Sequence, residues 1–188
     1  MRIDYKNIYL QTFQDENIEK CSQSRFDNSC FFLHDIDSIE NSCNWIKKHR
    51  DNKLDTLFEI HLKETDDYIG AVGYKIEHER CEIGRFTLDI KNLRKYLMQN
   101  QSSAKVSPTK EACIGLIFYL YEKILTNEKI FARVFEDNTY SNALCSFFST
   151  ICDIERITVN NKTMNEYIIS KEKYLEKYNE EKMFILYP

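Results

Sequence analysis

The stretch FARVFEDNTYSNALCSFF, residues Phe131–Phe148, joins two kinds of predicted element without a loop. Its first half alternates as a half-buried strand does, and its second half has the apolar spacing of a helix. The polar turn between them, residues 136–139, contains Asn138, a residue type that caps helix N-termini well. The stretch therefore predicts a strand that passes directly into a helix at Asn138.

The segment before this strand predicts a crossover helix. Pro108 suits the first helical position after an N-cap at Ser107, and the helix runs to about Leu125. It is apolar on nearly every side, so we expect other elements to cover more than one of its faces. The strand Cys81–Ile90 precedes this helix and the strand Lys129–Glu136 follows it, which predicts a parallel pair.

Short polar turns separate the strand-like runs upstream, so we expect antiparallel hairpins. These runs are Thr56–Lys63, Tyr68–Ile76 and Cys81–Ile90. Apolar and polar residues alternate along the first run, and we expect the polar set to face away from the core. That set is Glu59, His61 and Lys63.

Shorter elements are predicted near both ends of the chain. The N-terminal ones are a strand and two helices, Asn7–Phe13, Asp15–Cys21 and Ser38–Arg50, the last with Ser38 as its N-cap. The C-terminal ones are a hairpin and a charged helix, Glu155–Asn160 with Glu166–Ser170, and Lys171–Glu181. No regular element is predicted between Ile90 and Ser107. The fold class is therefore mixed α/β: an antiparallel meander, a βαβ unit and a C-terminal hairpin.

Length and composition favour one globular domain over residues 1–188. With 43% hydrophobic and 30% charged residues the chain is typical of soluble proteins, and its net charge of −4 argues against a general nucleic-acid binder. No apolar run approaches the roughly 18 residues of a membrane span, and the N-terminus lacks the apolar core of a secretion signal. The seven cysteines are scattered without a CxxC pair, which indicates reduced thiols in the cytoplasm and no metal site.

Four segments, in their order and spacing, resemble the GNAT superfamily of N-acetyltransferases. They are YIGAVGYKI, CEIGRFTLDI, TKEACIGLIFYLYEKI and KIFARVFEDNTYSNAL, within Thr56–Phe148. The nearest resemblance is to the branch of ribosomal-protein N-terminal and sugar-nucleotide N-acetyltransferases. It implies a GNAT-like domain that transfers an acetyl group from acetyl-CoA, as co-substrate, to a primary amine. The acceptor would be a small molecule, such as an amino sugar, or a protein N-terminus.

The resemblance also implies where acetyl-CoA binds. The strand before Asn138 would splay from its parallel neighbour, and the pantetheine arm would lie in the gap. That arm would bond the backbone of the neighbouring strand at Arg85, Phe86, Thr87 and Leu88. Asn138 and Ser141 would lie at the mouth of the gap. From the residues alone, Asn138 is equally well a helix cap and Ser141 a surface serine.

Acetyl transfer requires a base for the amine and an acid for the leaving thiolate. Glu82 is the first candidate for the base, although a solvated carboxylate or a partner of Arg85 would look the same. Glu59 and His61 are alternative bases. Cys145 is a candidate acid, because it occupies the position seven residues after Asn138 where many family members have tyrosine. A small core residue is the simpler interpretation of a cysteine there.

The loop before the central helix departs from the family pattern R/Q-x-x-G-x-G/A, because Ser103–Lys110 contains no glycine. Candidate phosphate contacts are Lys105, Ser107, Thr109 and Lys110, together with the helix N-terminus. A solvated polar loop is the alternative. The departure leaves open a second function, a non-catalytic binding or interaction module with a GNAT fold.

The two N-terminal helices would form part of the acceptor site. Aromatic and acidic residues there could hold a cationic acceptor, although core packing explains most of the aromatic ones equally well. They are Phe26, Phe31, Phe32, Asp35, Asp37 and Trp45. We expect no nucleic-acid or membrane partner, and a homodimer stays open.

Overall fold

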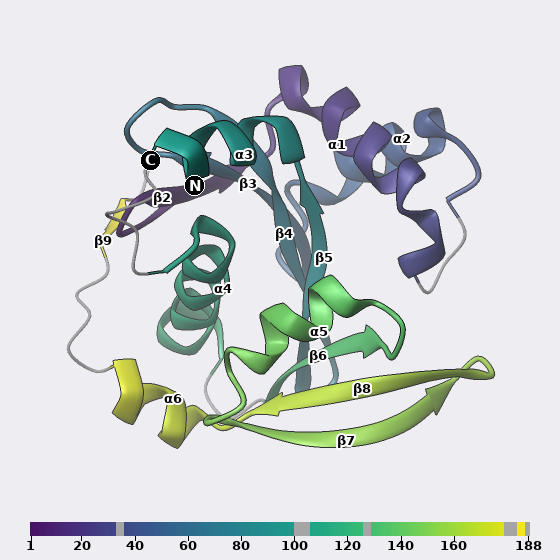
Figure 1. The fold of residues 1–188 in the computed structure, drawn as a ribbon, viewed down its shortest axis with the longest axis vertical. Coiled ribbons are helices and arrows are strands. Elements are labelled where there is room, and N and C mark those ends of the chain that lie inside the picture. Colours follow the sequence, from purple (N-terminus) through teal and green to yellow (C-terminus); the bar gives the residue numbers. More distant parts are fainter. Residues whose placement is uncertain (33–35, 100–105, 126–128, 179–183, 187–188) are drawn as a thin grey trace.

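The computed structural model describes residues 1–32, 36–99, 106–125, 129–178 and 184–186. Within these ranges one mixed sheet has the strand order β7-β8-β6-β5-β4-β3-β2-β1-β9 (Figure 1). The strands are β1 (Arg2–Tyr5), β2 (Ile8–Thr12), β3 (Asp55–Leu62), β4 (Tyr68–Glu77), β5 (Arg80–Leu88), β6 (Lys129–Phe135), β7 (Cys152–Val159), β8 (Lys162–Ile169) and β9 (Phe184–Leu186). The α-helices are α1 (Asp15–Asp27), α2 (Ile39–His49), α3 (Ile90–Gln99), α4 (Pro108–Tyr119), α5 (Thr139–Ser146) and α6 (Lys171–Tyr178). A 3₁₀ turn, η1 (Ser29–Phe31), follows α1, and a π-helical turn, η2 (Leu120–Ile124), continues α4.

The pairing of the strands confirms the predicted mixed α/β fold class. Strands β3, β4 and β5 form the antiparallel meander, and β7 pairs with β8 as the C-terminal hairpin. Strands β5 and β6 are parallel and are joined through α4, as the βαβ pattern predicts. Ser38 caps α2 by accepting a hydrogen bond from the Asn41 backbone N–H, as expected.

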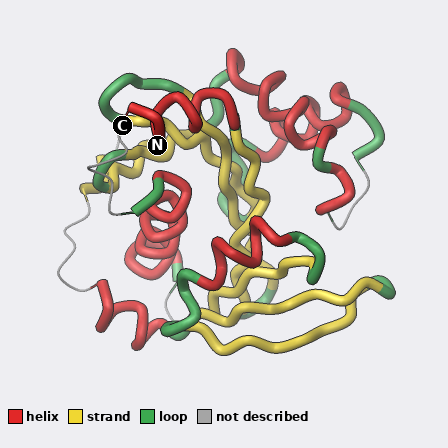
Figure 2. The backbone as a smooth tube through the Cα atoms, viewed as in Figure 1, coloured by secondary structure: helices red, strands yellow, loops and turns green. Residues whose placement is uncertain are grey.

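Helices cover both faces of the sheet (Figure 2). The larger core lies on the face of α4, whose side chains are buried nearly all round, and Tyr174 and Tyr178 of α6 join it. The smaller core lies on the opposite face, between the sheet and helices α1 and α2, and includes Ile18, Cys21 and Ile46. Because apolar residues of β4 contribute to both cores, this central strand is apolar on both sides, whereas the apolar residues of β3 alternate with Glu59 and His61.

Four elements differ from the sequence prediction, and one of them is strand β9, for which no element was predicted. Helix α3 occupies a segment for which no element was predicted, because exposed Leu97 and Met98 obscure the helical spacing of its inner residues. Helix α1 continues past Cys21 to Asp27, and the short strand β1 precedes the predicted strand β2. No helix in the described part of the chain is long and apolar enough to cross a membrane.

The polar residues of β3 face away from Phe58 and Ile60 as predicted, but two of the three are buried. Glu59 is 0% and His61 is 6% exposed, whereas Lys63 just after the strand is exposed. Glu59 and His61 do point away from Phe58 and Ile60, but α1 and the turn that precedes it cover this second face. Alternation therefore predicted the face and not its burial.

Candidate functional site

Strands β5 and β6 separate soon after they begin. They pair only at Arg80–Lys129, Cys81–Ile130 and Glu82–Phe131, although β5 continues to Leu88 and β6 to Phe135. Beyond this point β6 stays paired with β8 on its other side. Within the described residues, β5 therefore has no strand partner on its β6 side from Ile83 onward. This is the splayed pair that the resemblance to the superfamily implied, and Figure 1 shows β5 and β6 running apart.

A bulge interrupts β5 at the start of its unpaired edge. Gly73 pairs with Gly84 and Ala71 with Thr87, so two residues of β5 oppose one of β4. Arg85, inside the bulge, has a φ of 57°, which is unusual for a residue with a side chain. Left-handed backbone at such a residue costs about 1–2 kcal/mol, and strain of this kind clusters at functional sites. The bulge redirects the backbone of Arg85, Phe86, Thr87 and Leu88, the residues predicted to bond the cofactor.

The joint between β6 and α5 is held mainly by Asn142, which was not singled out from the sequence. Its Nδ2 donates to the carbonyl oxygens of Phe135 (2.8 Å) and Asn138 (2.9 Å). Its Oδ1 accepts from Asn165 Nδ2 (3.1 Å) and from the Tyr167 hydroxyl (2.9 Å). One side chain thus ties the strand end, the turn and the neighbouring strand β8 together. The sequence signal that could have identified Asn142 is its position one helical turn after the cap residue Asn138.

Asn138 is the N-cap of α5, as predicted, because its Oδ1 accepts a hydrogen bond from the Ser141 backbone N–H at 3.1 Å. Its side-chain amide NH₂ group is not needed for this cap. Ser141 is half-buried in the first turn of α5. Both residues therefore lie at the β6–α5 joint, while their place at the mouth of the gap and their contacts with a cofactor stay predictions.

We expect Asn142→Ala to lower the free energy of unfolding by about 2–3 kcal/mol, because carbonyl groups and the Tyr167 hydroxyl lose their partners. Urea denaturation of both proteins measures this difference. The control is Asn41→Ala, on the exposed face of α2, which should change stability by about 0.5 kcal/mol or less. A similar small change for Asn142→Ala would show that the β6–α5 joint does not depend on this side chain.

Helix α4 begins at Pro108, and the first N–H groups of any helix have no acceptor within the helix itself. Ser107 occupies the N-cap position, but its hydroxyl makes no capping bond and lies 3.1 Å from Thr109 Oγ1. Lys110 Nζ lies 4.4 Å from the centre of the Phe147 ring, which places it between α4 and the end of α5. Lys105 lies outside the described residues. A glycine-free helix start of this kind still offers N–H groups and cations to an anion.

The acidic residue in the first turn of α4 is engaged elsewhere. Glu111 is 2% exposed and accepts hydrogen bonds from the Asn7 backbone N–H (3.0 Å) and from Asn7 Nδ2 (2.9 Å). Burial raises the pKa of this carboxyl group, and the bonds from Asn7 oppose that effect. Glu111 thus anchors the start of α4 to the β1–β2 turn.

Glu82 lies at the point where β5 and β6 part. Its neighbours Cys81 and Ile83 belong to the core on the α4 side, so alternation places Glu82 on the α1 and α2 side. Burial raises the pKa of Glu82, while the charges of Arg133 and Arg85 act in the opposite direction. Arg133 Nη1 is 4.0 Å from the carboxylate and is its ion-pair partner, in place of Arg85. A carboxyl group with a raised pKa is a better base than an ordinary glutamate.

Cys145 packs partly buried against the core on the α4 side. Burial, and to a lesser extent Cys152, raises the pKa of its thiol to about 12. An ordinary thiol has a pKa of about 8.5, so proton transfer from Cys145 to a leaving thiolate is uphill by several kcal/mol. Core packing is therefore the better supported role. The hydroxyl-bearing residue of α5 nearest to Cys145 in the sequence, other than the serines, is Tyr140, which is 89% exposed.

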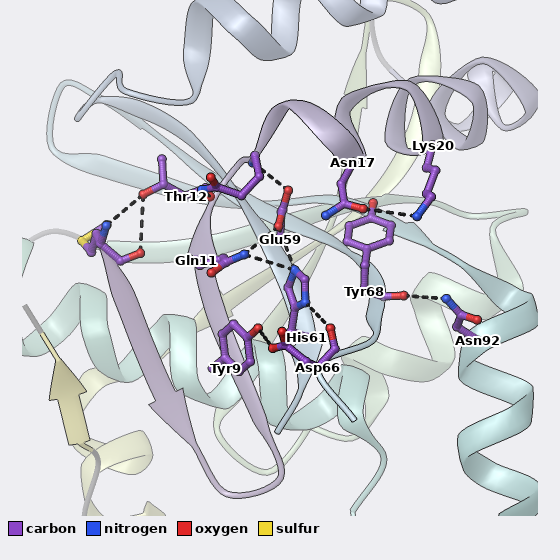
Figure 3. A network of polar contacts seen from close by, with 12 residues as sticks. Tyr9, Gln11, Thr12, Asn17, Lys20, Glu59, His61, Asp66, Tyr68 and Asn92 are labelled. Carbon is purple, nitrogen blue, oxygen red and sulfur yellow. Dashed lines mark hydrogen bonds and ion pairs between the residues drawn. The ribbon is translucent and has the colours of Figure 1, made fainter. Parts of the chain in front are cut away.

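The alternative bases Glu59 and His61 form a closed network (Figure 3). Glu59 accepts hydrogen bonds from the Gln14 backbone N–H (2.7 Å), from Gln11 Nε2 (3.0 Å) and from His61 Nε2 (2.7 Å). His61 Nδ1 is 2.9 Å from the Asp66 carbonyl oxygen. Burial opposes the charged imidazole, but the bonds to Glu59 and Asp66 outweigh it and raise its pKa. All these polar groups have partners within the network, which favours a structural role over a catalytic one. His78 is exposed in the β4–β5 turn.

The residues suggested for a cationic acceptor do not gather around a negative charge. Trp45 has two arginine side chains near its ring, those of Arg25 and Arg85. Phe32 lies over Arg25 as well, Phe26 and Phe31 are each 39% exposed, and Asp37 is exposed. Asp35 lies outside the described residues. Arg25 was not among the candidates because a single arginine in a charged helix gives no local signal of burial.

No protein-family profile matches this sequence, and no curated protein sequence matches it. Solved structures match it in fold. A GNAT-family acetyltransferase from Bacillus anthracis has 18% identity and a TM-score of 0.63, with 89% of this chain and 96% of that chain covered. FdhC, a nucleotide-linked sugar GNAT, has 18% identity and a TM-score of 0.66, with 95% of each chain covered.

A third match, RimL, is a ribosomal alpha-N-protein acetyltransferase solved in complex with coenzyme A. It has 12% identity and a TM-score of 0.64, with 89% of this chain and 97% of that chain covered. Identities this low leave the substrate of the present protein open, but the shared element order extends over nearly the whole of each chain. The resemblance read from four sequence segments is confirmed: this chain has the fold of the GNAT N-acetyltransferases.

Proposed function

We propose that residues 1–188 form a single acetyl-CoA-dependent N-acetyltransferase domain that acetylates a primary amine. The observation that carries this proposal is the splayed β5–β6 pair with a strained bulge at Arg85. In the described residues this edge of β5 has no strand partner, and strained backbone of this kind clusters at ligand sites, which supports a ligand here. The seven cysteines are all free thiols, which supports a reducing compartment such as the cytoplasm.

The opening fits acetyl-CoA at both of its ends. The free edge of β5 from Ile83 onward offers backbone N–H and C=O groups to an extended chain of amides, as an added strand would use them. The start of α4 offers backbone N–H groups and the Ser107 hydroxyl to phosphates, with Lys110 nearby. When bound, acetyl-CoA supplies an activated acetyl thioester.

Residues around the opening would carry out the remaining steps, which are polarisation of the thioester carbonyl and removal of the proton from the amine. Backbone N–H groups of the β5 bulge would polarise the thioester carbonyl, because fixed donors stabilise charge that develops on oxygen. Glu82 would take the proton of the amine, directly or through water, and its raised pKa suits this task. Asn142 and Asn138 would hold α5 in place beside the leaving group.

The direct test is a thermal melt with and without acetyl-CoA. At a concentration about 100 times the Kd, a ligand specific to the native state adds about 2.7 kcal/mol of stability. For a chain of this size that corresponds to a rise in Tm of roughly 5–10 °C. Acetyl-CoA should give this rise and free pantetheine a smaller one, since pantetheine lacks the phosphates. No shift at millimolar acetyl-CoA would reject the enzyme and leave the non-catalytic module as the better function.

A further inference from the structure

Arg25 in α1 is a buried cation with few partners. The residue is 7% exposed, and its guanidinium carbon lies 4.4 Å from the centre of the Trp45 ring and 4.9 Å from that of Phe32. Its Nε donates to Ser42 Oγ at 3.1 Å. Its Nη1 is also buried and has no hydrogen-bond partner among the residues that the structure describes. One end of the guanidinium is thus held by α2, and the other end is unused.

The charge of Arg25 is not neutralised by any residue that the structure describes. None of the ion pairs among the described residues includes Arg25, and the carboxylate of Asp55, which already pairs with Arg85, opposes the lowering of its pKa. Burial lowers the pKa of Arg25, and the positive charge of Arg85 lowers it further. An uncompensated buried charge is costly, so its retention suggests an anion that comes from outside the chain.

Arg85 connects this cation to the acyl-transfer site. Its guanidinium carbon lies 4.9 Å from the centre of the same Trp45 ring. Both hydrogen bonds that the structure gives its guanidinium start from Nη1, to Asp55 and to the Tyr74 carbonyl oxygen. Its backbone is the bulge on which the acetyl group would be held. The ring of Trp45 therefore has a guanidinium of α1 and a guanidinium of the transfer site beside it.

The charges around Trp45 leave an excess of one cation. Asp55 balances Arg85, and His49 Nε2 approaches the same carboxylate at 3.7 Å. Glu82 is shared with Arg133, and no further carboxylate approaches Arg25 in the described residues. This environment repels an extra positive charge and favours an oxyanion, since arginine presents a planar fork that matches carboxylate and phosphate oxygens.

We propose that Arg25 and Arg85 form a subsite for an oxyanion on the acceptor, so that the acceptor is a small primary amine that also carries a carboxylate or phosphate group. This inference rests on the proposed acetyl transfer and replaces the cationic acceptor suggested by the sequence. The anionic group would bond Nη1 of Arg25 while the amine reaches the β5 bulge. Phe32, which is only partly buried, covers one side of the guanidinium and would turn aside.

The experiment compares pairs of amines that differ only in the anionic group. The probes are O-phosphoethanolamine against ethanolamine, and 4-aminobutyrate against butylamine, with thiol release as the measure of kcat/KM. Hydrogen bonds to charged groups discriminate by roughly 10- to 100-fold, and we expect a preference of that size for the anionic member of at least one pair. The two pairs distinguish phosphate from carboxylate. Equal kcat/KM within both pairs would overturn the proposal.

Substitutions of the two arginines test whether they cause the preference for the anionic amine. Arg25→Gln should reduce it to about threefold or less by raising KM for the anionic amine, while the neutral amine is acetylated as before. Arg25→Lys keeps the charge without the fork and should retain part of the preference. Arg85→Gln, at a partly exposed position, tests the subsite if Arg25→Gln does not fold. Arg2→Gln, in β1 and four strands from β5, is the matched control. A full preference in folded Arg25→Gln and Arg85→Gln would reject the subsite.

A binding measurement that does not depend on acetyl transfer distinguishes failure of the oxyanion subsite from failure of the proposed function. Calorimetric titration of the wild-type protein with inorganic phosphate and with acetate should detect binding of at least one of these anions. Arg2→Gln should bind the same anion, and Arg25→Gln should not. If acetyl-CoA fails to bind, the acetyltransferase is rejected, and anion binding that requires Arg25 would still support the subsite. If acetyl-CoA binds and neither anion nor anionic amine is recognised, the subsite alone is rejected.

Discussion

Glu82→Gln should lower kcat for amine acetylation by about a hundredfold or more and leave acetyl-CoA binding unchanged. The amide keeps the size of the side chain, but it cannot take a proton from the amine, and general base catalysis contributes about 10²–10⁴ in rate. Glu82 is the partly buried carboxylate at the point where β5 and β6 part, and burial raises its pKa. Steady-state kinetics gives kcat, and a thermal melt with acetyl-CoA gives binding.

The pH profile distinguishes a base from a structural carboxylate. A base acts in its deprotonated form, so wild-type activity should fall as the pH drops through the pKa of Glu82, which lies above the ordinary value of 4.5. The pH profile of the Glu82→Gln variant should lack this fall in activity at acidic pH. Glu79→Gln, at an exposed position in the adjacent β4–β5 turn, is the matched control and should behave as wild type. A Glu82→Gln enzyme with more than about a third of wild-type kcat would exclude Glu82 as the base.

Glu59→Ala should lower the free energy of unfolding by about 3–5 kcal/mol, because it removes one partner of a buried ion pair. The substitution leaves the Gln14 backbone N–H, the Gln11 amide and His61 without their shared acceptor. For a chain of this length the corresponding drop in Tm is roughly 6–20 °C. Calorimetry or a thermal melt measures it directly, and Glu64→Ala at an exposed turn position is the control.

The same variant tests the charge on His61. The pKa of His61 is raised in the folded protein by its bonds to Glu59 and Asp66, which outweigh burial. A raised pKa stabilises the folded state below the ordinary pKa of 6.5, and this contribution is lost as the pH rises through the folded value. The difference between wild type and Glu59→Ala should therefore be largest at acidic pH and shrink, without vanishing, in alkaline solution. A loss below about 1 kcal/mol at every pH would contradict the structural role of this network.

Local patterns were enough to predict the order of the elements. The meander β3–β4–β5, the crossover through α4 and the hairpin β7–β8 follow from alternation, turn length and helical spacing, all of which act between near neighbours in the chain. The caps Ser38 and Asn138 are equally local, since each bonds a backbone N–H three residues on. The resemblance to the superfamily, which includes the strand-to-helix joint at Asn138, also implied where β5 and β6 separate.

What the sequence could not show is how separate elements combine. Alternation placed Glu59 opposite Phe58, but only the packing of α1 over that face made Glu59 a buried network residue. Gly84 directly precedes the bulge at Arg85, and a glycine inside a strand is a known bulge signal, but it does not tell which residue takes the positive φ.

Asn142 and Arg25 show the same limit. The partners of Asn142 come from β6, the following turn and β8, and those of Arg25 come from α2 and the segment after η1. Burial and charge balance are sums over residues that are distant in the chain, and a local pattern contains no information about them. The sequence by itself thus determined the strand and helix frame around the proposed acyl-transfer site, and the tertiary structure decided which charges lie near that frame.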